Sequence, residues 1–137
     1  MTCEQWQKDR KLDKMDFVME DALYRYLEEL YELRGFDSET SKEYARDNVN
    51  RIEQLAYADK LEYPSDDVIV DAISDLKVFG CGDLMKLNYD PDKCHEETLK
   101  EISSRNGDWS DEKGKWVKDV HQDPKTLYKA DYSKCKV

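Results

Sequence analysis

The sequence has fewer basic than acidic residues, only two histidines and no long apolar run, and each of these features argues against a class of function. Lysine and arginine number 22 against 32 aspartate and glutamate residues, which gives a net charge of −10. A general nucleic-acid-binding surface needs a basic patch that displaces counterions, so we do not expect one. No apolar run approaches the ~20 residues of a membrane span, so we expect no membrane partner either.

Cysteine and histidine also do not form a recognisable metal site. The four cysteines, at positions 3, 81, 94 and 135, include no CxxC pair and no zinc-like spacing with either of the two histidines. Cys81 lies in an apolar helical context, where a free thiol is expected to be a small core residue. The first residues, MTCEQWQKDRK, lack the apolar core of a secretory signal. We therefore expect a reduced, cytoplasmic protein.

Apolar residues make up 39% of the chain, which favours a folded protein over a disordered one. Nearly all of the pattern is helical, and no segment alternates convincingly at period two, so no strand is predicted. We expect an all-α bundle of four to five helices over residues 1–105. Residues 106–137, rich in lysine and aromatics, are predicted to be an extended tail packed on the same single domain.

Local signals place the helices. They are expected at about residues 2–12, 16–34, 41–61, 66–88 and 90–105. Gly35 is a fitting residue just past the second helix. Thr40 with Glu43 makes a capping-box pattern for the third. Asp90 followed by Pro91 is typical of a helix start.

The segment LEELYELRG, residues 27–35, concentrates carboxylates on the second helix. Glu28, Glu29 and Glu32 fall within about a 100° arc of one helical face. Carboxylate oxygens are the ligands that Mg²⁺ prefers, and adjacent helical turns can aim several at one point. The commoner alternative, on this helix alone, is that the arc simply faces water.

The fourth helix adds two more acids. It is apolar on almost every side, which predicts that it is buried. Asp71 and Asp75 stand in it at i, i+4, and neither has a basic residue three or four positions away. Two unpaired buried carboxylates would repel each other and be costly to desolvate, so protons or cations would have to neutralise them. The alternatives are a partly exposed helix edge, or lysine and arginine partners from another helix.

The two helices together predict a cluster of five carboxylates that binds a divalent metal between facing helices. Oxygen-only ligation favours Mg²⁺, or Mn²⁺, over zinc or iron. Such metals most often serve phosphate chemistry, in which they bridge phosphate oxygens and activate water. The predicted metal ligands are Glu28, Glu29, Glu32, Asp71 and Asp75.

The tail region offers counter-charge for phosphates. Arg105, Lys113, Lys115 and Lys118 are the predicted substrate-binding residues, and Lys129 carries a further positive charge. Trp109, Trp116 or Tyr128 would stack on a base. The alternative is that these lysines are only solvated.

Five segments give the chain a family resemblance. They are EELYE (28–32), DAISDLKVFGCGDLMKLNYDPD (71–92), KEISSR (100–105), GKWVKD (114–119) and PKTLYKADYSKC (124–135). Together they resemble the MazG-like nucleotide pyrophosphohydrolases encoded by tailed bacteriophages, which belong to the all-α NTP pyrophosphatase superfamily. The resemblance covers roughly residues 17–35 and 66–136.

The resemblance implies an enzyme that cleaves an NTP or dNTP between the α and β phosphates, giving a nucleoside monophosphate and pyrophosphate. The catalytic residues would be Glu28, Glu29, Glu32 and Asp75. The family's second motif is usually ExxD; Asp75 matches its aspartate, while its first acid falls on Ala72, where Asp71 would substitute. The separation between the two acidic motifs is also long here. Both departures bear on the metal geometry.

The family also implies a homodimer or homotetramer, with bundles completed across subunits, and a location in the host cytoplasm if the chain is phage-encoded. An alternative from a different class is a non-catalytic acidic helical protein that binds a basic host partner or a nucleotide signal. No motif encodes the preferred base or sugar, or says whether an alarmone is the substrate.

Overall fold

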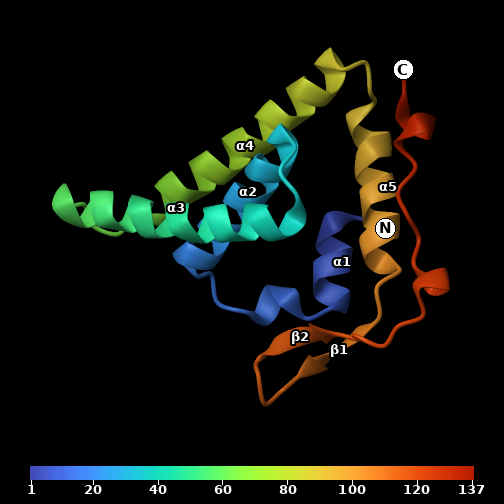
Figure 1. The fold of residues 1–137 in the computed structure, drawn as a ribbon, viewed down its shortest axis with the longest axis horizontal. Coiled ribbons are helices and arrows are strands. Elements are labelled where there is room, and N and C mark those ends of the chain that lie inside the picture. The colour runs from blue at the N-terminus through green and yellow to red at the C-terminus, as the bar shows by residue number, and fades with distance from the viewer. The chain divides into compact units, whose positions relative to one another are not determined.

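The computed structural model describes all 137 residues, and these form two compact units. The first unit comprises Met1–Met15 and Asp66–Val137, and the second comprises Asp16–Ser65. The chain is mostly helical, with five α-helices and one small two-stranded sheet (Figure 1). The predicted all-α character is therefore confirmed at the level of helical content.

The second unit is a helical hairpin of α2 (Met19–Arg34) and α3 (Ser38–Ala58). Gly35 ends α2 at a φ of 108°, in the left-handed region that favours glycine. The side chain of Asp37 then caps α3 by accepting the N–H of Thr40 at 2.7 Å. Because Asp37 takes the capping position, α3 begins at Ser38, three residues before its expected start.

Small residues and aromatic rings hold this hairpin together. Tyr31, Phe36 and Tyr44 meet edge to face, with ring centroids 5.5 to 5.8 Å apart, close to the loop that joins the helices. The side-chain amide of Asn48 on α3 also donates to the hydroxyl of Tyr31 on α2. The buried residues of the hairpin are Ala22, Ser41, Ala45 and Val49.

The first unit contains α1 (Cys3–Asp9), α4 (Asp66–Lys86) and α5 (Pro91–Ser103). As predicted, α5 starts at Asp90, whose carboxylate accepts the N–H groups of Asp92 and Lys93 at 2.9 and 3.2 Å. Pro91 occupies the first helical position, where its missing N–H has no intrahelical partner to lose.

The prediction that the chain has no strands is wrong for part of the tail. β1 (Gly107–Ser110) and β2 (Lys115–Lys118) form an antiparallel pair in which Trp109 lies opposite Trp116. Each strand has only four residues, which is too short for a period-two pattern to stand out.

After the β-hairpin formed by β1 and β2, the chain runs back along α5 to the C-terminus through two 3₁₀ turns, Pro124–Thr126 and Tyr132–Cys135 (Figure 1). Backbone hydrogen bonds fix its end. The N–H of Asp90 donates to the carbonyl of Cys135 at 2.8 Å, and the N–H of Val137 donates to the carbonyl of Asn88 at 3.0 Å. The tail is thus a packed part of the first unit.

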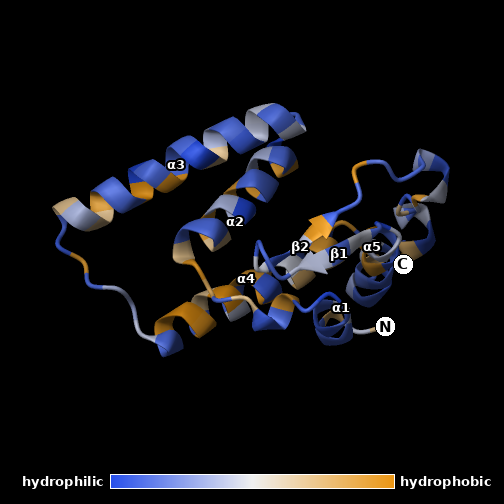
Figure 2. Cartoon of the chain, turned by 90° about the horizontal axis from the view of Figure 1, so that it is seen from below, coloured by the Kyte–Doolittle hydropathy of each residue, from blue (hydrophilic) through white to orange (hydrophobic).

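The prediction that the fourth helix is buried is wrong for the single chain. No residue of α4 is buried, and Phe79 is 65% exposed. Figure 2 shows the apolar residues of α4 in orange along most of the helix. Cys81 is likewise exposed, whereas Cys94 and Cys135 are the buried thiols. Hydropathy indicates that a helix avoids water; it does not say which surface covers it. No helix has both the length and the apolarity that crossing a membrane requires.

Candidate functional site

The three glutamates of α2 form an acidic cluster without a basic partner. Glu28 and Glu32 are half-buried and Glu29 is exposed. None of the three takes part in an ion pair, since the ion pairs of the chain join Lys8 to Glu4, Lys86 to Asp83 and Lys100 to Glu97. No ion pair therefore offsets the negative charge of the cluster.

This crowding shows in the protonation of Glu29. Although the residue as a whole is exposed, partial desolvation of its carboxyl group raises the pKa above the ordinary value, and the charges of Glu32 and Glu28 raise it further. A side-chain hydrogen bond with Glu32 acts in the same direction. Carboxylates that repel each other in this way favour a cation or a proton among them.

Asp71 and Asp75 do not have the environment that the sequence predicted. Both lie on α4 and both are exposed, so water can solvate them. The prediction that these two carboxylates are buried is wrong for the single chain, for the same reason as the burial of α4. Their predicted roles as metal ligands rest on their residue type and on the family resemblance.

Neither unit by itself brings three or more acidic, cysteine or histidine side chains together as a metal site. The predicted ligands are divided between the units: Glu28, Glu29 and Glu32 belong to Asp16–Ser65, and Asp71 and Asp75 to the other unit. The donor set consists of carboxylate oxygens alone, with no competing basic side chain on the α2 cluster. Its chemistry fits Mg²⁺.

A pocket of the first unit is lined by residues from the end of α1, from the chain just after α5 and from the β1–β2 hairpin. Its volume is about 700 Å³. Its lining includes three predicted substrate-binding residues, Arg105, Lys113 and Lys118, and both indoles of the hairpin, Trp109 and Trp116. The structure thus places at one pocket five of the residues that the sequence predicted to bind the nucleotide.

Arg10 builds one wall of this pocket, and sequence reasoning missed it. One terminal guanidinium nitrogen donates to the carbonyls of Ile102, Ser103 and Arg105 at 3.2 to 3.4 Å, where α5 ends. A cation at a helix C-terminus satisfies free carbonyls and the helix dipole. Burial lowers the pKa of Arg10, although Asp9 opposes this shift. The guanidinium remains charged at neutral pH.

The same guanidinium lies between two indoles. Its carbon is 4.6 Å from the ring centroid of Trp6 and 5.4 Å from that of Trp116. The cation–π contact with Trp116 joins α1 to the β1–β2 hairpin. The only sequence signal for this arrangement is local: Trp6 and Arg10 are four residues apart, so they share one face of α1.

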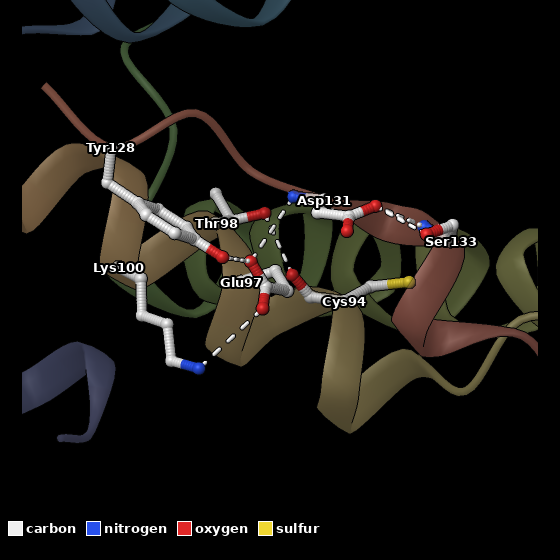
Figure 3. A network of polar contacts seen from close by, with 7 residues as sticks. All are labelled: Cys94, Glu97, Thr98, Lys100, Tyr128, Asp131 and Ser133. Atoms are coloured by element: carbon white, nitrogen blue, oxygen red, sulfur yellow. Dashed lines mark hydrogen bonds and ion pairs between the residues drawn. The ribbon is translucent and has the colours of Figure 1, made fainter.

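Three residues predicted to supply counter-charge or stacking lie outside the pocket: Lys115, Lys129 and Tyr128. Lys115 is exposed but does not line the pocket. Tyr128 is engaged in a polar network on α5, where its hydroxyl donates to Oε2 of Glu97 at 2.5 Å (Figure 3). The phenol therefore anchors the C-terminal segment to α5. No resolved contact places it at the pocket.

Comparisons with protein-family models, with curated proteins and with solved structures found no match for this chain.

Proposed function

We propose that the chain is a Mg²⁺-dependent nucleotide pyrophosphohydrolase that cleaves an NTP or dNTP between its α and β phosphates. The observation that carries this proposal is the α2 cluster, in which Glu28, Glu29 and Glu32 lie on one helical face and form no ion pair with a lysine or arginine. Arg25 lies three and four positions before Glu28 and Glu29 but forms no ion pair with either, so the repulsion among the three glutamates is not offset. A cation-binding role accounts for that cost.

In this proposal Glu28, Glu29, Glu32 and Asp75 hold the metal, and Asp71 assists in place of the absent acid at Ala72. A bound Mg²⁺ would supply charge neutralisation at the phosphate oxygens and a more acidic water. One glutamate of the cluster accepts a proton from the attacking water. Arg105 and the tail lysines at 113, 115 and 118 balance the charge of the phosphates.

We further propose that the chain acts as a homodimer or homotetramer. The exposed apolar side chains of α4 support this, because a soluble monomer rarely leaves such a surface in water. Association would cover α4 and would change the surroundings of Asp71 and Asp75.

The test is pyrophosphate release from the eight ribo- and deoxyribonucleoside triphosphates, with Mg²⁺ and with EDTA. We expect release with Mg²⁺ only. Glu29→Gln and Asp75→Asn are each expected to abolish it while the helical circular dichroism spectrum stays intact. Glu53→Gln, at an exposed position of α3, is the matched control and should retain full turnover. Turnover that survives Glu29→Gln or Asp75→Asn contradicts the proposal.

The alternative is a non-catalytic protein that uses its net charge of −10 against a basic partner. The exposure of Asp71 and Asp75 on α4 is the observation that favours it. Millimolar Mg²⁺ separates the two functions. It should raise the melting temperature of an enzyme with a metal site through linkage, whereas a binder of basic proteins should hardly respond. Salt should instead weaken the binder's complex.

A further inference from the structure

The pocket beside the β1–β2 hairpin is lined by three basic side chains that form no ion pair within the chain. Arg105, Lys113 and Lys118 line it, and none of them forms an ion pair, although acidic residues outnumber basic ones by ten. The fourth cation, Arg10, is instead committed to the carbonyls at the end of α5. Three positive groups are therefore available to a ligand.

One of the two indoles in the pocket is also available. Trp116 already packs against the guanidinium of Arg10, and its ring lies so close to Gly107 that a Cβ there would overlap it. Trp109 is different. Its Nε1–H donates to Asp111 at 3.0 Å, which holds the edge of the ring and leaves its faces free of any aromatic or cationic neighbour.

We propose that this pocket binds a nucleoside triphosphate, with the base stacked on Trp109 and the phosphates on Arg105, Lys113 and Lys118. Stacking on an aromatic ring suits every base, and ammonium and guanidinium groups suit phosphate oxygens. The inference rests on the proposed function and deepens it, because it assigns recognition of the nucleotide to the first unit alone.

The charge of the pocket fits a small nucleotide better than a nucleic acid. Its four cations face three aspartates, Asp9, Asp108 and Asp119, so its formal charge is about +1. A single-stranded nucleic acid needs a basic groove that follows its backbone over several nucleotides. The aspartates provide acceptors for sugar hydroxyls or exocyclic amines of a nucleotide.

The walls of the pocket are pre-formed, which limits the ordering that a ligand must impose. Arg10 joins α1, the end of α5 and Trp116. On the other side of the hairpin, the N–H of Asp119 donates to the carbonyl of Asn106 at 2.7 Å. The side chain of Gln122 bonds the N–H of Asn106 and the carbonyl of Ser104 at 2.6 and 2.7 Å. The hairpin is thus fixed to α5 at its base.

The experiment is calorimetric titration of the full chain in EDTA, where the metal-dependent reaction is absent, with ATP, GTP, CTP and UTP and with inorganic tripolyphosphate. Trp109→Leu and Lys118→Gln are each expected to raise the dissociation constant of the best nucleotide roughly tenfold. Lys125→Gln makes the same charge change at an exposed position outside the pocket and should alter it less than about twofold. Circular dichroism checks that each variant is folded.

Three results would overturn the inference: equal effects of Lys118→Gln and Lys125→Gln, tripolyphosphate binding as tightly as every nucleotide, or a single-stranded oligonucleotide displacing the nucleotide at lower concentration. The fate of the enzymatic proposal is read separately. If the protein releases pyrophosphate but the pocket variants do not change nucleotide binding, the pocket assignment is wrong and the enzymatic proposal stands. If the pocket variants weaken nucleotide binding but no pyrophosphate is released, the pocket assignment stands and the enzymatic proposal is wrong.

Discussion

The hydroxyl of Tyr128 donates a 2.5 Å hydrogen bond to Oε2 of Glu97, a residue 31 positions earlier in the chain. Glu97 is only 4% exposed, and it also accepts the N–H of Asp131 at 3.3 Å and lies 3.6 Å from the ammonium group of Lys100 (Figure 3). One buried carboxylate on α5 thus holds the C-terminal segment in place.

This network predicts a loss of stability in acid. The hydrogen bond from Tyr128, more than any other contact, lowers the pKa of Glu97 below its ordinary value. A carboxylate with a depressed pKa contributes stability above its unfolded value of about 4.3, and that contribution is lost as the pH falls through the lower folded pKa. Urea unfolding should therefore show Glu97→Gln to be less stable than wild type at neutral pH, with a difference that shrinks below about pH 4.

Glu96→Gln is the matched control, because Glu96 is the exposed neighbour of Glu97 and makes no resolved contact with the tail. It should unfold like the wild type at both pH values. Equal stability of Glu97→Gln and Glu96→Gln at neutral pH would show that the tail is held by other contacts.

For the α2 cluster we predict the opposite dependence of stability on pH. The pKa of Glu29 is raised by burial and by Glu32 and Glu28, so the folded state favours its protonated form. Stability is therefore lost as the pH rises from the ordinary glutamate value to the higher folded pKa, and the loss is complete above the folded pKa. Without metal, Glu29→Gln should be more stable than wild type by roughly 0.2–1 kcal/mol, the range for partly exposed charges.

Thermal unfolding in EDTA at neutral pH and near pH 4 measures this gain, which should disappear at the lower pH. Glu53→Gln should show no gain at either pH. Millimolar Mg²⁺ should reverse the order by stabilising the wild type alone. A destabilised Glu29→Gln in EDTA would mean that the carboxylate makes a favourable contact in the fold.

Local signals in the sequence predicted the end of α2 and the start of α5, although they placed the start of α3 three residues late. The φ of Gly35 and the cap formed by Asp90 depend on neighbours within a few residues, which is why both were predictable. The wall made by Arg10 was not, because its acceptors at Ile102, Ser103 and Arg105 lie more than ninety residues away. Nothing in a local pattern encodes such a contact.

The same distinction between local and long-range contacts applies to the residues of the candidate site. The spacing of Glu28, Glu29 and Glu32 on one helix fixed their proximity, because a helical turn brings such positions together. The burial of Asp71 and Asp75 depended on what covers α4, which hydropathy does not state. The convergence of Lys113 and Lys118 at one pocket required the hairpin, whose strands were too short to predict.

The hairpin makes Gly107 sensitive to substitution. A Cβ at this position would overlap the ring of Trp116 and the carbonyl of Val117. Gly107→Ala should destabilise the chain by about 1–3 kcal/mol, as overpacking does, and should weaken nucleotide binding in the pocket. In contrast, Gly80→Ala on α4 meets open space and should stabilise by roughly 0.5–1 kcal/mol, because alanine favours a helix. Chemical unfolding of the two variants gives the comparison. A Gly107→Ala variant with unchanged stability would show that the β1–β2 hairpin packs differently.

The exposed side of α4 predicts self-association. Val78, Phe79 and Met85 are each more than 60% exposed, so burying them against a second copy would release apolar surface from water. Light scattering coupled to size exclusion should give a mass that is a multiple of 16.2 kDa. Phe79→Asp should shift it to the monomer, because a charge buried in an apolar interface is costly. Ser74→Asp adds the same charge at a polar position of α4 and, if the apolar side chains drive association, should leave the mass unchanged. A wild-type protein that stays monomeric at a concentration of tens of micromolar would contradict the oligomer. An equal shift in mass caused by both variants would indicate that net charge, and not the apolar face of α4, determines the association.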